Sequence, residues 1–129
     1  YGAQPTVWIR HTLPVSSAAV GGKAVLLRWL GGKRFAQQLR TRGLLTNHGF
    51  AGVYGFDAAD EKAYGNYMRR WLEVAQNGML TMCHPAVKPV ANDAIGVQRY
   101  VEFSYLKSVA LTQLCARLGI VLGRMLAVV

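Results

Sequence analysis

An apolar run that ends abruptly in histidine and proline, Met79 to Pro85, constrains this sequence more than any other segment. It is short and is bounded by Asn77-Gly78 and by the proline, which is typical of a strand buried on both faces of a parallel sheet. His84 would then lie at the carboxyl end of that strand. Because ligands and catalytic groups gather at that end of parallel sheets, His84 is a candidate general acid or base. The alternative is a histidine that only closes the strand through a hydrogen bond.

The other segments alternate between strand-like and helix-like patterns. Strands are predicted over 5–10 and 79–83, and a strand or strand-like loop close to other backbone over 44–56. Helices are predicted over 16–30, 33–43 and 57–77, the last opened by Asp57 and Asp60. A long final helix follows the loop 86–96, carries Glu102 on its polar side and ends at Gly119, and 120–122 could add a strand. This order predicts an α/β fold, a parallel sheet or part of a barrel, in one domain over 1–129.

Positive charge is concentrated in the first part of the chain. The net charge is +9, and residues 1–56 contain seven basic side chains and no acidic one. Such a bias can attract nucleic acid or an anionic surface. However, Lys33, Arg34, Arg40 and Arg42 surround Phe35, Ala36 and Leu39 at helical spacing, so a solvated helix face explains them as well. We therefore keep a basic binding module as the alternative function.

The two cysteines, Cys83 and Cys115, lie in apolar segments, which favours buried free thiols over a disulfide. Successive strand residues point to opposite faces, so we do not expect Cys83 and His84 to act as a pair. No secretory signal and no apolar run of about 20 residues is visible, so we expect a cytoplasmic protein without a membrane span.

Four motifs in order resemble the carboxyl-terminal half of the YdjC-like carbohydrate deacetylases, in particular the branch associated with hopanoid biosynthesis. They are Trp8-Ile9-Arg10, Thr46-Asn47-His48-Gly49-Phe50-Ala51-Gly52-Val53, Leu80-Thr81-Met82-Cys83-His84-Pro85 and Arg99-Tyr100-Val101-Glu102-Phe103. The Met-Cys-His-Pro segment with the downstream Arg-x-x-Glu-Phe is the most specific part.

The resemblance implies half of a TIM-barrel-like (β/α) barrel, similar to the polysaccharide deacetylases, and hydrolysis of the N-acetyl group of an amino sugar. It implies that His84 is the general acid for the leaving amine and that Arg10 lies near the site. It further implies that Asn47 and Phe50 contact the substrate. Since Arg10 and His84 both end predicted strands, we expect them at the same end of the sheet.

The resemblance also implies a divalent metal, Mg or Zn, whose ligands lie in the half of the barrel that this sequence does not match. His11, His48 and His84 have no metal-ligand spacing, so we assign no metal ligand here. Since a full α/β barrel takes about 200 to 250 residues, we expect a fragment that is inactive by itself. Exposed sheet edges would favour a homo-oligomer.

Overall fold

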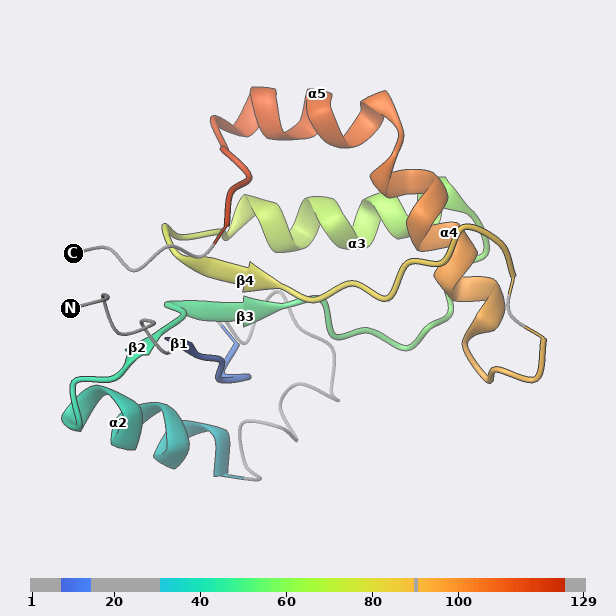
Figure 1. Cartoon of the computed structure of the whole chain (residues 1–129). Helices are drawn as coiled ribbons and strands as arrows, with labels where there is room; N and C mark the ends of the chain where they lie inside the picture. The colour runs from blue at the N-terminus through green and yellow to red at the C-terminus, as the bar shows by residue number, and fades with distance from the viewer. Residues whose placement is uncertain (1–7, 15–30, 90, 125–129) are drawn as a thin grey trace, which may run out of the picture.

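The computed structural model describes residues 8–14, 31–89 and 91–124, so the helix expected over 16–30 lies outside the described residues (Figure 1). The first half of the described chain contains β1 (Trp8–Ile9), α2 (Lys33–Thr41), β2 (Leu45–Thr46) and β3 (Gly49–Ala51). The second half contains α3 (Glu61–Glu73), β4 (Met79–Thr81), α4 (Gly96–Leu106) and α5 (Val109–Leu118). The fold is therefore mixed α/β, as the sequence predicts.

All strand pairs are parallel, but the strands are short. β1 pairs with β2 and β3 pairs with β4, in two separate two-stranded sheets. A single parallel bridge between Pro14 and Phe50 shows that the chain after β1 continues beside the segment that holds β2 and β3. From Trp8 to Pro14 the chain advances six residues, while its partner advances five from Leu45 to Phe50, so one side holds an extra residue, as in a bulge. The described residues form no closed barrel.

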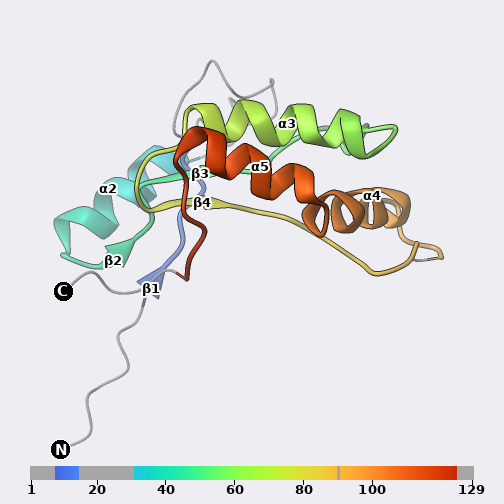
Figure 2. The ribbon, with the colours of Figure 1, turned by 90° about the horizontal axis from the view of Figure 1, so that it is seen from above.

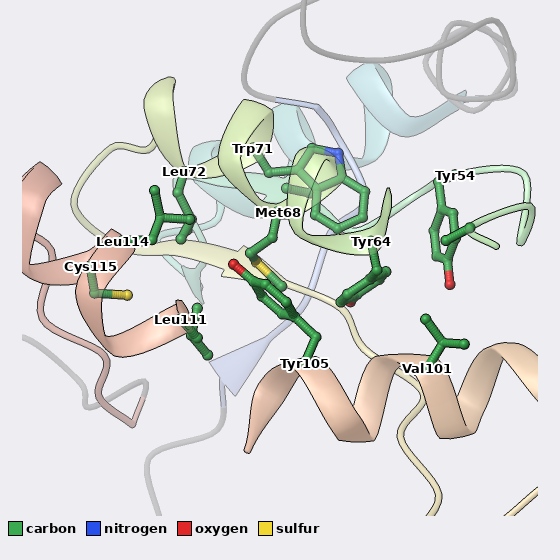
Figure 3. Close-up of a cluster of buried hydrophobic side chains, with 12 residues drawn as sticks. Tyr54, Tyr64, Met68, Trp71, Leu72, Val101, Tyr105, Leu111, Leu114 and Cys115 are labelled. Carbon is green, nitrogen blue, oxygen red and sulfur yellow. The ribbon is translucent and has the colours of Figure 1, made fainter. Parts of the chain in front are cut away.

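Two helices lie over β3 and β4 on one side, and a third packs against them. Figures 1 and 2 show α3 and α5 running side by side above the two strands, with α4 beyond the carboxyl end of β4. The core between them is rich in aromatic side chains (Figure 3). Its largest members are Tyr54, Tyr64, Met68, Trp71, Leu72, Tyr105 and Leu114. Because the core lies on this side, the chain after β4 is held against α3 and α4.

Helix α2 lies apart from this core, beside β2. It buries Ala36 and Leu39 and leaves its basic side chains in solvent. Phe35, which the spacing placed on the apolar face, is 44% exposed, because it precedes Ala36 and points away from the narrow buried stripe.

Local signals predicted the helix ends well, with two corrections. Asp60 alone caps α3, accepting the N–H of Ala63 at 2.8 Å, whereas Asp57 lies before the helix and accepts the hydroxyl of Tyr67. The expected long final helix is two helices, because the hydroxyl and N–H of Ser108 both bind the carbonyl oxygen of Tyr105 and end α4. Gly119, with left-handed backbone, ends α5 as predicted.

The predicted strand over 120–122 does not form. Ile120 to Leu122 instead line one side of a cleft of about 620 Å³, and Gly78 to Thr81 line the other. Within the described parts of the chain, no helix is long and apolar enough to cross a bilayer. Cys83 and Cys115 are free thiols, as expected.

Candidate active site

His84 lies just beyond β4, at the carboxyl end of the strand. Pairing continues past Thr81, because the N–H of Met82 donates to the carbonyl oxygen of Ala51 at 2.9 Å. A Cβ on Gly52 would lie 2.1 Å from the carbonyl oxygen of Met82, so only glycine permits this approach. The close contact expected for this glycine-rich segment is therefore confirmed. It sets the path along which the chain reaches His84.

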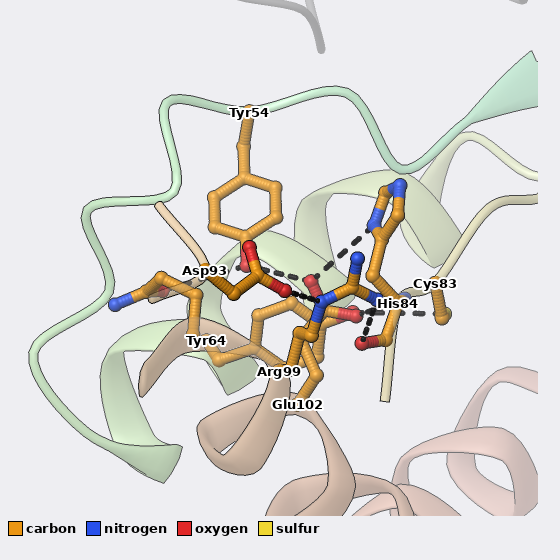
Figure 4. A network of polar contacts seen from close by, with 8 residues as sticks. Tyr54, Tyr64, Cys83, His84, Asp93, Arg99 and Glu102 are labelled. Atoms are coloured by element: carbon orange, nitrogen blue, oxygen red, sulfur yellow. Dashed lines mark hydrogen bonds and ion pairs between the residues drawn. The ribbon is translucent and has the colours of Figure 1, made fainter. Parts of the chain in front are cut away.

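Helix α4 holds the main chain of His84 on both sides (Figure 4). The Glu102 carboxylate accepts the N–H of His84 at 2.5 Å, and Nη1 of Arg99 donates to its carbonyl oxygen at 3.3 Å. The N–H of Ala86 donates in turn to the carbonyl oxygen of Arg99. Because residues three apart share a helix face, the Arg-x-x-Glu motif acts as a clamp on this histidine.

The carboxylate of Glu102 is fully buried, which corrects its expected place on the polar side of the helix. Its Oε1 accepts the hydroxyl of Tyr54 at 2.7 Å and lies 3.7 Å from Nδ1 of His84. Burial and the bond to Glu102 raise the pKa of Tyr54, so this hydroxyl remains a donor. Glu102 faces inward because its carboxylate accepts hydrogen bonds from the hydroxyl of Tyr54 and the N–H of His84. Hydrophobic periodicity does not reveal such partners.

The imidazole of His84 is partly accessible, with a side-chain exposure of 24%. The ring of Phe56 packs against it edge to face at a centroid distance of 5.3 Å. Phe56 itself has a left-handed backbone, with φ of 57°, which is unusual for a residue other than glycine. One side of the imidazole therefore faces Glu102 and Phe56, while part of the ring remains open to solvent.

The loop before α4 is held by an ion pair. Nε of Arg99 lies 2.6 Å from Oδ2 of Asp93, whose Oδ1 accepts the N–H of Ile95. The bonds from Ile95 and Arg99 lower the pKa of Asp93. The pair orients Arg99 toward His84.

Cys83 points elsewhere. Its Sγ lies 3.6 Å from the hydroxyl of Tyr64, and burial raises the pKa of the thiol. His84 instead faces Glu102. The thiol is thus protonated and turned into the core, as the strand geometry predicted, and the two neighbours form no nucleophile pair.

Arg10 is not among the side chains that surround His84. It follows β1 directly, but the register places it level with Asn47, several residues before the point where His84 lies. Its guanidinium lies 6.0 Å from the centre of the Phe50 ring. The structure therefore does not bring Arg10 and His84 together at one end of a sheet.

Asn47 and Phe50 are both buried. The amide of Asn47 binds the main chain of His11 and of Gly49, and Phe50 is part of β3. Both residues shape the sheet, and their contact with a substrate stays a prediction.

The three histidines lie in different surroundings. His11 is buried against Asn47, His48 is exposed beside the carbonyl oxygen of Asn77, and His84 faces Glu102. Among residues 8–14, 31–89 and 91–124, no three His, Cys, Asp or Glu side chains are grouped so that they could hold a metal ion. The described residues thus do not fit a metal site, and we derive no step through one.

Sequence reasoning missed the roles of Tyr54, Arg99 and Glu102. The signal for two of them was the Arg-x-x-Glu spacing itself, an acid and a base on one helix face shortly after the histidine. Tyr54 gave no such signal, because its neighbours in sequence are Val53 and Gly55, neither of which is polar.

Parallel strands, covering helices and a clamped histidine beyond a strand end define an α/β protein with a candidate acid-base site. A family model described as "YdjC-like protein" matches residues 1–117, and the chain therefore belongs to the YdjC-like family, which is generally related to carbohydrate deacetylation. No curated protein and no solved structure matches the chain.

Proposed function

We propose that this chain is part of a carbohydrate N-deacetylase and supplies the group that protonates the departing amine. The observation that carries the proposal is the placement of His84, beyond a parallel strand, with its main chain clamped by α4 and its ring partly open. A histidine with a fixed main chain and an accessible imidazole suits general acid catalysis. The substrate class is an N-acetylated amino sugar.

The reaction is amide hydrolysis. Water adds to the acetyl carbonyl, the C–N bond breaks, and the nitrogen leaves as an amine while acetate is released. The nitrogen is a poor leaving group unless it gains a proton, and the imidazolium of His84 donates that proton as the bond breaks. The other part of the chemistry, activation of water by a divalent Mg or Zn, belongs to ligands that we do not assign to this chain.

The finer family assignment is part of the same proposal. The parallel segments 8–14, 45–51 and 79–82 would be neighbouring strands of a (β/α) barrel whose remaining strands come from elsewhere in a longer protein. The chain would be a fragment of the branch associated with hopanoid biosynthesis, and it would be inactive alone. What supports this is the order of the motifs together with the parallel pairing.

Acetate release from N-acetylated chito-oligosaccharides tests the proposal. The 129-residue chain should release none with Mg²⁺ or Zn²⁺. In a longer protein that contains these residues, His84→Ala should lower turnover by roughly 10²- to 10⁴-fold, the usual contribution of positioned acid-base catalysis. His48→Ala, which removes an exposed histidine, is the matched control and should leave turnover unchanged. Full activity of His84→Ala would refute the proposal.

The alternative is binding of nucleic acid or an anionic surface by α2. The exposed Lys33, Arg34 and Arg40, with no acidic residue in the helix, favour it. Such binding would weaken steeply with added salt, because counterions are released on association. Titration of DNA with the chain at 50 and 200 mM salt tests this binding. Weaker binding at the higher salt and in Arg34→Gln would support it, whereas no binding would indicate a solvated helix face.

A further inference from the structure

We propose that Glu102 sets the tautomer of His84, holding the proton on Nδ1 and leaving Nε2 to exchange protons with a bound substrate, with Tyr54 fixing the carboxylate. Glu102 and Tyr54 are then positioning residues that act through His84. The use of that proton in amide hydrolysis rests on the proposed function. The tautomer itself does not, and it can be measured separately.

The first observation is an unpartnered buried atom. Nδ1 of His84 is buried and has no hydrogen-bond partner, and Oε1 of Glu102 lies 3.7 Å from it. Buried polar atoms are nearly always paired. A charge-assisted hydrogen bond between them would form at about 2.8 Å, so the imidazole must move toward Glu102 to make it.

The second observation is that the carboxylate is fixed and has acceptor capacity to spare. Its two oxygens accept one bond each from Tyr54 and from the N–H of His84, and no part of Glu102 is exposed. An ionised carboxylate offers about four acceptor sites. The unused capacity on Oε1 is available to Nδ1–H, and the imidazole is the part that can move.

The third observation concerns charge. Among the described residues, His84 is the only basic side chain within ion-pair distance of Glu102. A buried carboxylate is costly unless it is paired, so a hydrogen bond from Nδ1–H of this neighbour is favoured.

Other titratable groups near His84 do not compensate for Glu102. Burial raises the pKa of Tyr54, Tyr64 and Cys83, so all three remain neutral near pH 7. Arg99 faces the carbonyl oxygen of His84, not its ring, and is paired with Asp93. Glu102 is thus the charge that dominates at the imidazole.

The pairing has a mechanistic consequence. With Nδ1–H directed at Glu102, the neutral ring carries its lone pair on Nε2 and the charged ring carries a proton there. Proton exchange is confined to one nitrogen.

Nuclear magnetic resonance of the ¹⁵N-labelled 129-residue chain tests this directly. Two-bond couplings of the imidazole report which nitrogen carries the proton. In the unaltered chain the neutral ring of His84 should carry its proton on Nδ1. Glu102→Gln removes the negative charge that attracts Nδ1–H and should shift the neutral ring toward the Nε2–H tautomer. An unchanged tautomer would overturn the proposal.

A second variant keeps the test valid if Glu102→Gln does not fold. Tyr54→Phe removes a donor from Oε1 of Glu102, so the fraction of the neutral ring with its proton on Nδ1 should rise. Tyr67→Phe removes the hydroxyl that binds Asp57 and is the matched control, with no change expected. A fall of the Nδ1–H fraction in Tyr54→Phe would contradict the proposal. If the tautomers behave as expected but His84→Ala is active in the longer protein, the role of Glu102 holds and the proposed function fails.

Discussion

The side chain of Asn47 takes the place of main-chain hydrogen bonds between two parallel segments, because it bonds both the N–H and the carbonyl oxygen of His11. Its Oδ1 accepts the N–H of His11 at 2.9 Å, and its Nδ2 donates to the carbonyl oxygen of the same residue at 3.0 Å. Nδ2 also donates to the carbonyl oxygen of Gly49. The side chain thus joins the segment after β1 to the bend between β2 and β3, opposite the extra residue of segment 8–14 that prevents regular pairing.

Replacing Asn47 by alanine should destabilise the chain by roughly 3 kcal/mol, because it orphans three buried main-chain groups that cost about 1 to 3 kcal/mol each when unpaired. Urea unfolding measures the loss. Thr46→Val is the control, since the Thr46 hydroxyl is 3.4 Å from Oδ1 and contributes little. Equal stability of the two variants would show that Asn47 does not hold the segments together.

Gly52→Ala should cost roughly 3 kcal/mol or more, since the added Cβ would meet the main chain of Met82 and the residue has a φ of 99°. Gly43→Ala is a matched control: its φ of 64° is also left-handed, but the Cβ would meet nothing within 4 Å. It should cost about 1 kcal/mol. Thermal unfolding measures the stability of both variants. Similar losses would mean that backbone strain alone, and not the contact with Met82, causes the destabilisation.

His11 should make stability depend on pH. Burial lowers its pKa below the ordinary value of 6.5, and its Nδ1 accepts the N–H of Leu13 only when neutral. A depressed histidine pKa means that the unfolded chain binds more protons, so stability falls as pH drops from about 7 to 5. His11→Asn keeps an acceptor for the same N–H but does not titrate. Urea unfolding between pH 5 and 7 should show a shallower slope for this variant, and parallel slopes would contradict the assignment.

Self-association is expected at the free side of β4. No described strand pairs with its second edge, and Val121, which lines the adjacent cleft, is 92% exposed. Unpaired edges beside exposed apolar side chains favour pairing with another copy. Light scattering at micromolar concentration in moderate salt should give a mass above 14.2 kDa.

Two substitutions define the surface. Val121→Lys should restore the monomer, whereas Val109→Lys, at an exposed position of α5, should not. A monomer mass for the unaltered chain would show that the edge is already protected.

Local features were predictable because they depend on neighbours in sequence. Asp60 caps a helix through the third residue that follows it, Gly119 ends one through its own backbone freedom, and the apolar run before His84 predicts a strand wherever it packs. The parallel pairing followed from the alternation of these elements. The candidate acid-base residue was therefore recognisable from the sequence alone.

Tertiary structure decided what surrounds that histidine. A glutamate on a helix is ordinarily solvated, and only the arrival of Tyr54 and His84 from distant segments gives Glu102 the partners that make its burial favourable. The register of Arg10 was not predictable for the same reason, since the register of a strand depends on its partner and on the extra residue in segment 8–14. The sequence determines which helices and strands form, because these depend on short-range hydrogen bonds and hydrophobic periodicity. The burial of a charged side chain depends on hydrogen-bonding partners that only the tertiary structure brings together.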